Sequence, residues 1–266
     1  MNDVLRQNQS SWNAIADAFF GVTALPEYGC LIPTETELCL FGDVSGKKLL
    51  DIGCGSGHSL LYHAKRGAGE LWGLDISARQ LENAQGLLTE NGCAPKLFRS
   101  PMEENPGLPP GYFDFVYSIY AIGWTTDLKE TCRLAASCLK PGGAFIFSWD
   151  HPFMHSIAPL EGDFSGMPPS AAMNGRYVLD GGYLDSGPFS FKKNGMPMTL
   201  RNFKVSDYIN ALAGAGLCLE RMVEETDAEV LRRPAEFSSN YYAPSKAKLL
   251  PLSFVMKARK PSSAQG

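Results

Sequence analysis

The stretch KKLLDIGCGSGH at residues 47–58 decides the fold. The apolar run that begins at Leu49 predicts a buried strand, and three glycines then follow at every second position from Gly53 to Gly57. A helical pattern starts near His58. A glycine turn between a strand and a helix lets the backbone approach a nucleotide closely, because glycine has no Cβ and tolerates positive φ. The stretch therefore predicts an α/β domain that binds a nucleotide-like cofactor.

Two classes of cofactor use such a turn. The dinucleotide fingerprint is G-x-G-x-x-G, with the pyrophosphate held at the helix N-terminus. Here the spacing is G-x-G-x-G, and His58 occupies the position of the third glycine in that fingerprint. This spacing counts against NAD, although a nicotinamide-dependent oxidoreductase remains the alternative interpretation.

Residues 50–57, LDIGCGSG, resemble the glycine motif of the class I S-adenosylmethionine (SAM)-dependent methyltransferases. A second predicted strand ends in Asp75, roughly 20 residues after the glycines, where a ribose-binding carboxylate is expected. The LKPGG segment at residues 139–143 is a third point of similarity. The resemblance covers residues 34–258 and is greatest to the ubiquinone-type and natural-product branch, whose acceptors are small molecules.

The resemblance implies a Rossmann-like seven-stranded sheet flanked by helices, with strand order 3-2-1-4-5-7-6 and the last strand antiparallel. Residues 1–46 are expected to form an N-terminal helical cap, and residues 47–260 the SAM-binding methyltransferase domain. Residues 261–266 are expected to be a disordered tail.

Residues 153–204 interrupt the alternation of predicted strands and helices and contain many Pro, Gly, Met and aromatic residues. Because a long insertion of this kind is usually functional, we expect a lid that forms much of the acceptor pocket. A small β-ribbon is predicted around residues 176–179 and 189–191.

The resemblance implies SAM as the cofactor and S-adenosylhomocysteine as its product. It implies that Asp75 accepts hydrogen bonds from the ribose hydroxyls and that Ile76 packs against the adenine. The family usually has an acid after the third strand, where this chain has Ser100 and Pro101, so Glu103 or the backbone around Met102 is expected to contact the adenine edge. The full set of expected cofactor-binding residues is Asp51, Gly53, Cys54, Gly55, Gly57, Asp75, Ile76, Met102, Glu103 and Ser118.

Aromatic side chains are expected around the acceptor, because the SAM sulfonium is a cation and aromatic faces attract cations. Ser10 or Ser11 is expected to cap a helix that carries Trp12 and Phe19. The expected pocket residues are Trp12, Phe19, Tyr28, Tyr120, Trp124 and Tyr177, and core packing is the alternative role for these rings. The aromatic and methionine content of the insertion favours an aromatic or heteroaromatic small molecule.

Asp150 and His151 follow the predicted fifth strand, at the ligand edge of the sheet. Methyl transfer requires an acceptor held in line, exclusion of water, and removal of a proton where the acceptor carries one. His151 is the expected general base and Asp150 orients it, because imidazole titrates near neutral pH. Holding the turn by hydrogen bonds is the alternative role for His151, and His155, Glu27, Tyr28 and Tyr177 are further candidates. Methylation of oxygen or nitrogen is favoured, and methylation of carbon is possible.

The charge and cysteine content exclude several other classes of function. The net charge is −4 without a basic run, which argues against nucleic acid or an anionic membrane as a partner. The seven cysteines lack metal-site spacing, so no metal is expected, and reduced thiols in the cytoplasm are the simplest interpretation. No apolar run approaches the length of a membrane span. A non-catalytic SAM-binding or interaction domain is a second alternative, and no pattern indicates the oligomeric state.

Overall fold

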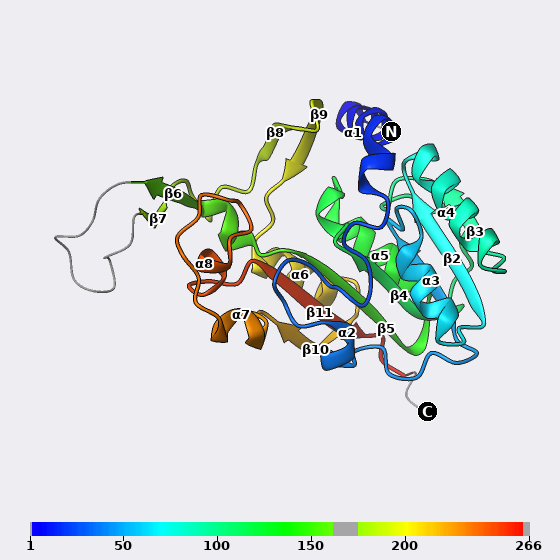
Figure 1. Cartoon of the computed structure of the whole chain (residues 1–266). Helices are drawn as coiled ribbons and strands as arrows, with labels where there is room; N and C mark the ends of the chain where they lie inside the picture. Colours follow the sequence, from blue (N-terminus) through cyan, green and yellow to red (C-terminus); the bar gives the residue numbers. More distant parts are fainter. Residues whose placement is uncertain (1, 162–174, 263–266) are drawn as a thin grey trace.

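A seven-stranded sheet forms the centre of the computed structural model, which describes residues 2–161 and 175–262 (Figure 1). The strand order is β10-β11-β5-β4-β1-β2-β3, and β11 alone in this sheet runs antiparallel to its neighbours β5 and β10. The strands are β1 (Lys48–Ile52), β2 (Glu70–Asp75), β3 (Lys96–Arg99), β4 (Phe113–Ile119), β5 (Leu139–Asp150), β10 (Cys218–Val223) and β11 (Ser253–Arg259). The predicted order, with an antiparallel seventh strand, is confirmed.

Both faces of the sheet are covered, because successive side chains of a strand enter opposite faces. Leu49 of β1 and Ile146 of β5 pack on one face, whereas Leu50 and Phe145 pack on the other. The first face is covered by α2 (Glu35–Leu38), α3 (His58–Lys65) and α4 (Ala78–Glu90), and the second by α5 (Leu128–Cys138) and α6 (Val205–Gly214). In parallel strands buried on both sides, near-continuous apolar runs are expected, as β5 shows.

The insertion after β5 begins with the 3₁₀ turn η3 (Pro152–Ser156) and contains two separate antiparallel strand pairs. The pairs are β6 (Ile157–Glu161) with β7 (Gly175–Leu179), and β8 (Pro188–Lys193) with β9 (Met196–Arg201). The segments 176–179 and 189–191 are strands as predicted, in β7 and β8, but a single small ribbon around them is wrong, since they belong to separate pairs. Residues 162–174 of the insertion and 263–266 of the expected tail lie outside the described residues.

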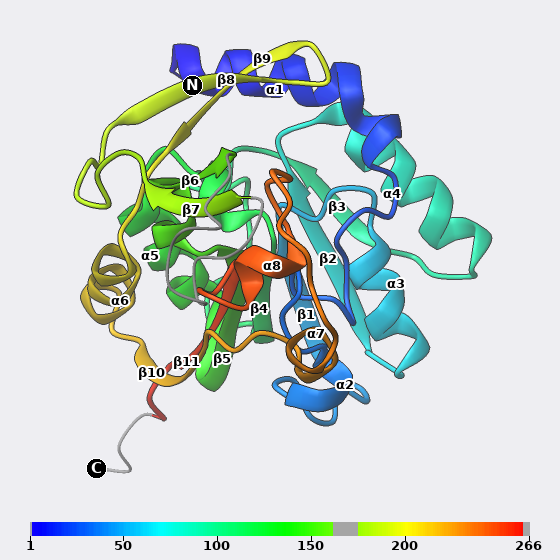
Figure 2. The same cartoon turned by 60° about the vertical axis from the view of Figure 1, so that its left-hand side comes forward.

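The two strand pairs point in different directions. The β6–β7 pair projects away from the sheet, whereas β8–β9 extends to helix α1 (Asp3–Ile15) (Figures 1 and 2). The remaining short elements are η1 (Ala16–Phe19), η2 (Ile122–Trp124), α7 (Ala228–Arg232) and α8 (Pro244–Ala247). Over the described part of the chain, no helix combines the length and apolarity needed to cross a membrane.

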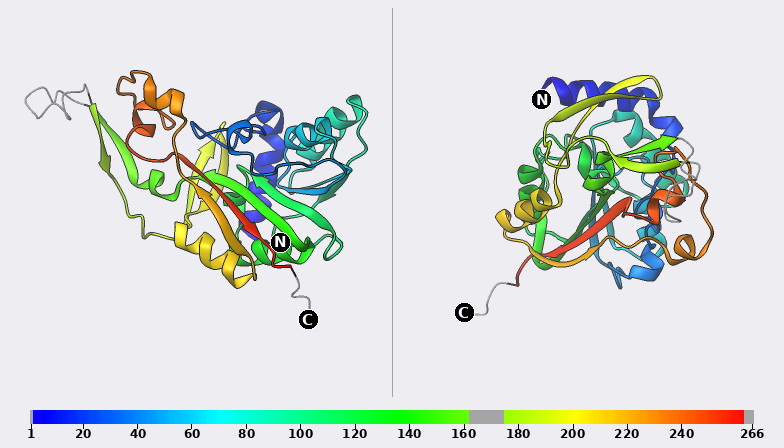
Figure 3. Two further views of the ribbon diagram at one scale, coloured as in Figure 1. Left: turned by 90° about the horizontal axis from the view of Figure 1, so that it is seen from below. Right: turned by 90° about the vertical axis from the view of Figure 1, so that its left-hand side faces the viewer.

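Helix α1 lies along β9 and is held there by polar side chains (Figure 3). The Asn8 amide donates to the Thr199 carbonyl at 2.7 Å and accepts from the Thr199 N–H at 2.9 Å. Ser11 Oγ donates to the Pro197 carbonyl at 2.6 Å. Asn8 and Ser11 are buried, so these bonds satisfy groups that would otherwise lose their hydrogen bonds to water.

The same helix also contacts the end of β2. Gln9 Nε2 donates to the Ile76 carbonyl at 2.9 Å, and Ser77 Oγ donates to Asn13 Oδ1 at 2.8 Å. Helix α1 therefore bridges the β8–β9 hairpin and the carboxyl end of β2. It begins at Asp3, earlier than predicted from Ser10 and Ser11, because the Asn2 side chain caps it.

Candidate functional site

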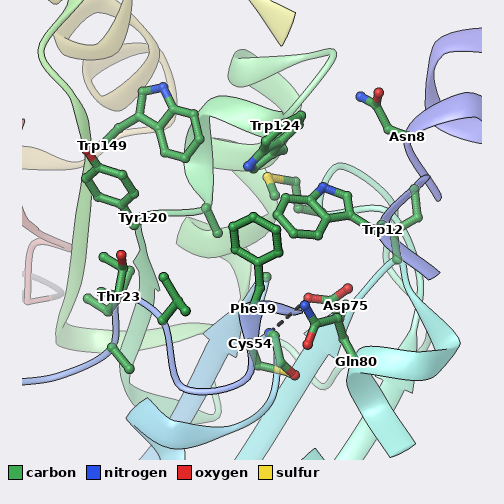
Figure 4. A pocket seen from close by; sticks show the side chains of 18 of the residues that line it. Asn8, Trp12, Phe19, Thr23, Cys54, Asp75, Gln80, Tyr120, Trp124 and Trp149 are labelled. Carbon is green, nitrogen blue, oxygen red and sulfur yellow. Dashed lines mark hydrogen bonds between the residues drawn. The ribbon is translucent and has the colours of Figure 1, made fainter. Parts of the chain in front are cut away.

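A cavity of about 790 Å³ lies at the carboxyl edge of the sheet (Figure 4). Its wall is formed by the glycine turn, the ends of β2, β4 and β5, helix α1, and the β8–β9 hairpin. In open α/β sheets, ligands bind beyond the carboxyl ends of the strands, so this cavity occupies the expected position.

The glycine turn between β1 and α3 forms one end of the cavity. Gly53 has φ +77°, and a Cβ on this residue would lie 2.5 Å from the Cβ of Ala121. Gly57 has φ +79°, and its Cβ would lie 2.9 Å from the Cβ of Ala84 in α4. Glycine is therefore required at both positions, by backbone conformation and by close approach.

The Asp75 carboxylate at the end of β2 fixes the shape of this turn. Its Oδ2 accepts the Gly55 N–H at 2.9 Å, and its Oδ1 accepts the Ser77 N–H at 2.8 Å. Burial raises the pKa of Asp75 to about 6, although these backbone donors oppose the shift. Each carboxylate oxygen can accept a further hydrogen bond, so Asp75 can still bind a diol in the cavity.

Three side-chain oxygens at this end of the cavity are buried and have no hydrogen-bond partner among the described residues. They are Asp51 Oδ1, Gln80 Oε1 and Glu103 Oε2, and all three residues line the cavity. Such oxygens require donors from a ligand or from water. SAM carries donors in its ammonium, ribose hydroxyls and adenine amino group, so the residues present fit this cofactor.

Glu103 is the acidic residue nearest to the position where the third-strand acid is missing. Its Oε1 accepts hydrogen bonds from the Thr126 hydroxyl and N–H. Its Oε2 is the unpartnered oxygen, and Ser100, Pro101 and Met102 line the cavity beside it. The chain thus presents a carboxylate oxygen here although it lacks the expected acid.

Aromatic rings form the middle of the cavity. The Trp12 ring lies edge-on to Phe19 and to Trp124, with centroids 5.4 and 5.1 Å apart. Figure 4 shows these three rings between Asp75 on one side and Tyr120 on the other. The structure therefore brings together four of the six expected pocket residues, Trp12, Phe19, Tyr120 and Trp124, and adds Trp149.

A buried carboxylate, Asp150, lies at the end of the cavity opposite Asp75. The Tyr120 hydroxyl donates to Asp150 Oδ1, and the Tyr242 hydroxyl donates to Oδ1 at 3.0 Å and to Oδ2 at 3.2 Å. Burial raises the pKa of Asp150, whereas these hydroxyls and the nearby His155 and Lys193 lower it. Tyr120 has φ +52°, an uncommon conformation for a bulky residue that directs its ring to Asp150.

His155 also lines this end of the cavity. Its Nδ1 lies 2.7 Å from the Tyr241 hydroxyl, and burial lowers the pKa of the imidazole. The neutral ring therefore predominates near pH 7. With Nδ1–H donating to Tyr241, Nε2 is free to accept a proton.

His151, expected as the base, does not line the cavity. Its Nε2 lies 2.7 Å from Glu224 Oε1, and its Nδ1 accepts the Phe153 N–H at 3.2 Å. Both ring nitrogens are thus occupied in holding the turn after β5. This geometry agrees with the alternative role for His151.

Three other expected site residues also lie away from the cavity. The Tyr28 hydroxyl donates to the buried Glu35 carboxylate, and the Tyr177 hydroxyl donates to the Ser238 carbonyl. Ser118 is fully buried within β4. Of the expected cofactor residues, Asp51, Gly53, Cys54, Gly55, Asp75, Ile76, Met102 and Glu103 line the cavity, and Gly57 supports the turn.

Phe189 and Phe191 of the insertion line the cavity, as expected of a segment that forms part of the pocket. Sequence reasoning missed several other residues that line the cavity, namely Gln80, Trp149, Lys193, Tyr241 and Tyr242. The only signal for the last two was a pair of tyrosines in a polar segment. Over residues 2–161 and 175–262, no three His, Cys, Asp or Glu side chains form a metal site.

Comparisons with known proteins agree with this geometry. Residues 50–147 match the family described as a methyltransferase domain. An uncharacterised protein of Haemophilus influenzae is 34% identical over 125 residues, which cover 46% of this chain and 49% of that protein. The ubiquinone biosynthesis O-methyltransferase of Pectobacterium carotovorum is 33% identical over 103 residues, or 39% of this chain and 43% of the enzyme. The chain thus spans less than half the length of these curated relatives.

A solved structure extends the similarity over most of the chain. The SAM-dependent methyltransferase from Mesorhizobium loti is 26% identical, with a TM-score of 0.66, over 84% of this chain and 95% of that one. From the domain match and this shared structure, residues 50–147 carry a methyltransferase domain, and the chain has the fold of the class I SAM-dependent methyltransferases, whose cofactor is SAM.

Proposed function

We propose that the protein transfers a methyl group from SAM to a small aromatic or heteroaromatic acceptor, at oxygen or nitrogen. The observation that carries the proposal is one cavity that runs from Asp75, past three aromatic rings, to Tyr120, whose hydroxyl donates to Asp150. SAM supplies an activated methyl group, and the chain must align the acceptor with it and exclude water. The aromatic middle of the cavity is suited to both tasks, because its rings pack against a flat acceptor and attract the cationic sulfonium.

The cofactor-binding roles follow from the position of Asp75 and from the unpartnered oxygens of Asp51 and Glu103. Asp75 is proposed to accept the ribose hydroxyls, with Ile76 against the adenine and Glu103 Oε2 accepting from the adenine amino group. Asp51 Oδ1 offers a further acceptor for a SAM donor. Helix α1 and the β8–β9 hairpin are proposed to act together as the lid, since hydrogen bonds from Asn8 and Ser11 join them.

Titration calorimetry with SAM, S-adenosylhomocysteine and NAD tests the proposal. Binding of both adenosyl ligands, without a response to NAD, is the expected result. NAD binding alone would favour a nicotinamide-dependent oxidoreductase. Binding of SAM without turnover of any phenol or heteroaromatic amine would favour a non-catalytic SAM-binding domain.

We further propose that His155, beside Asp150, is the general base in place of His151. A positioned base contributes about 10²–10⁴-fold to a rate, so His155→Gln is expected to lower kcat about 100-fold while SAM affinity is kept. His151→Gln is the matched control, since it removes an imidazole four residues away that does not line the cavity. Initial rates across pH, with an acceptor that turns over, provide the measurement.

The pH profile gives a second readout for the same pair of variants. Because burial lowers the pKa of His155, activity should persist to a lower pH than a free imidazole would allow. A wild-type rate in His155→Gln, or an equal loss in His151→Gln, would contradict this assignment.

A further inference from the structure

The charged groups that line the cavity are unevenly distributed in sign. Four carboxylates line it, from Asp51, Asp75, Glu103 and Asp150. Among the described lining residues, the only lysine or arginine is Lys193. The acidic groups at the Asp75 end can bind the hydrogen-bond donors of SAM. The cofactor donors do not account for a lysine in the cavity, so Lys193 requires another ligand group.

Lys193 enters the cavity because of its register on β8. Alternate residues of this strand, Phe189, Phe191 and Lys193, line the cavity, whereas Lys192 between them is exposed. The Lys193 ammonium lies 4.7 Å from the Phe19 ring centroid and 5.7 Å from that of Trp12. It therefore stands over the rings against which an aromatic acceptor would pack.

The Lys193 ammonium makes no hydrogen bond or ion pair within the described residues, and its stem is half-buried. Burial lowers the pKa of Lys193, and the Asp150 carboxylate acts in the opposite direction. However, Asp150 already accepts hydrogen bonds from Tyr120 and Tyr242, and no ion pair joins it to Lys193. A partly desolvated ammonium without an anion is costly, and contact with aromatic faces offsets only part of that cost.

We infer that Lys193 pairs with an oxyanion on the acceptor, so that the preferred acceptors are aromatic acids. This inference rests on the proposed function. The acceptor ring would pack in the cavity against the aromatic side chains beneath Lys193, Trp12 and Phe19, with its anionic group at the ammonium. A charge-assisted hydrogen bond in a water-poor cavity then selects the anionic acceptor over its neutral analogue.

The test uses the full chain saturated with S-adenosylhomocysteine and measures binding by calorimetry. The probes are 4-hydroxybenzoate, its neutral amide 4-hydroxybenzamide, and the cationic phenol tyramine. The benzoate is expected to bind about tenfold more tightly than the amide, which is the size of one charge-assisted hydrogen bond. Two further probes separate the possible anions: 4-methoxybenzoate offers only a carboxylate and 4-nitrophenolate only a phenolate.

Variants of neighbouring lysines provide the controls. Lys193→Met is expected to abolish the tenfold preference without weakening S-adenosylhomocysteine, and Lys193→Arg to retain it. Lys192→Met removes the same charge from the exposed face of β8 and should retain the wild-type preference.

Several results would overturn the inference while leaving the proposed function intact. They are equal affinity for benzoate and amide, tighter binding of tyramine, absence of binding by every probe, or a preference that survives in Lys193→Met. Weaker S-adenosylhomocysteine binding by Lys193→Met would instead indicate that Lys193 binds the carboxylate of the cofactor. Failure of the wild-type chain to bind S-adenosylhomocysteine would overturn the proposed function and this inference together.

Discussion

Replacing Asp75 with alanine is expected to weaken SAM binding by roughly 100-fold or more. The carboxylate is proposed to accept two ribose hydroxyls, and charge-assisted hydrogen bonds are each worth about 1.5–3 kcal/mol. The substitution also leaves the Gly55 and Ser77 N–H groups without their acceptor, which loosens the glycine turn. Calorimetry on the variant measures the effect, with circular dichroism to confirm that it is folded.

Asp43→Ala is the matched control for this substitution. Asp43 also accepts a backbone N–H, from Ser45 at 2.9 Å, but it is exposed and does not line the cavity. Its removal should leave SAM affinity unchanged. Unaltered SAM binding by a folded Asp75→Ala variant would remove Asp75 from the cofactor site.

The same carboxylate predicts how affinity depends on pH. With a pKa raised to about 6, Asp75 of the free protein is protonated below that pH, so SAM affinity should fall as pH decreases through 6. The effect of Asp75 on stability has the opposite sign. Between about pH 4 and pH 6 the folded protein keeps the Asp75 proton, whereas the unfolded chain has released it. The contribution of Asp75 to the free energy of unfolding therefore decreases as pH rises through this range. Asp75→Asn should remove this pH dependence of affinity.

Gly123→Ala is expected to lower the stability of the protein by about 3 kcal/mol, near the upper end for overpacking. A Cβ on Gly123 would lie 1.9 Å from Cε2 of the Trp149 indole. Trp149 is buried between Tyr120 and Trp124, with ring centroids 5.3 and 6.0 Å away, so it has little room to move. Thermal unfolding would show the loss as a decrease in Tm of roughly 10 °C.

Gly86→Ala distinguishes this steric effect from a general effect of losing glycine. Gly86 is exposed within α4, and a Cβ there would meet no atom within 4 Å. The substitution should stabilise the protein by about 0.5–1 kcal/mol, because alanine favours the helix. Adding Trp149→Phe to Gly123→Ala should restore part of the Tm, and an unchanged Tm in Gly123→Ala alone would contradict the packing argument.

The sheet and the cofactor end of the cavity could be predicted because their signals are local in sequence. The run from Leu49, the glycine turn and Asp75 lie within 27 residues of one another. The strand, turn and helix are each indicated by residues that are adjacent in sequence. At Pro101, where the chain departs from the family pattern, the predicted substitutes for the missing acid were also close in sequence. They were Glu103 and the backbone around Met102, and the structure places both residues at the cavity.

The contacts at the other end of the cavity could not be predicted, because they join distant segments. Tyr242 reaches Asp150 across 92 residues, and no periodicity in either segment indicates this contact. His151 and His155 lie in the same turn after β5, but only His155 lines the cavity. The sequence does not show which of the two imidazoles enters the cavity. The first part of α1 was missed as well, because Asn8 and Ser11 occupy its buried face in place of apolar residues.

The hydrogen bonds between α1 and β9 also have a consequence for how the protein is made. Thr199 leaves the ribosome 191 residues after Asn8, a delay of about 10–40 s at roughly 5–20 residues per second. During that interval α1 exists without its β9 partner, and Trp12 lacks the contacts that β8 and η2 later provide. This wall of the cavity therefore closes late in synthesis, and until the β8–β9 hairpin emerges α1 can bond to the end of β2 and to Ser77 but not to β9.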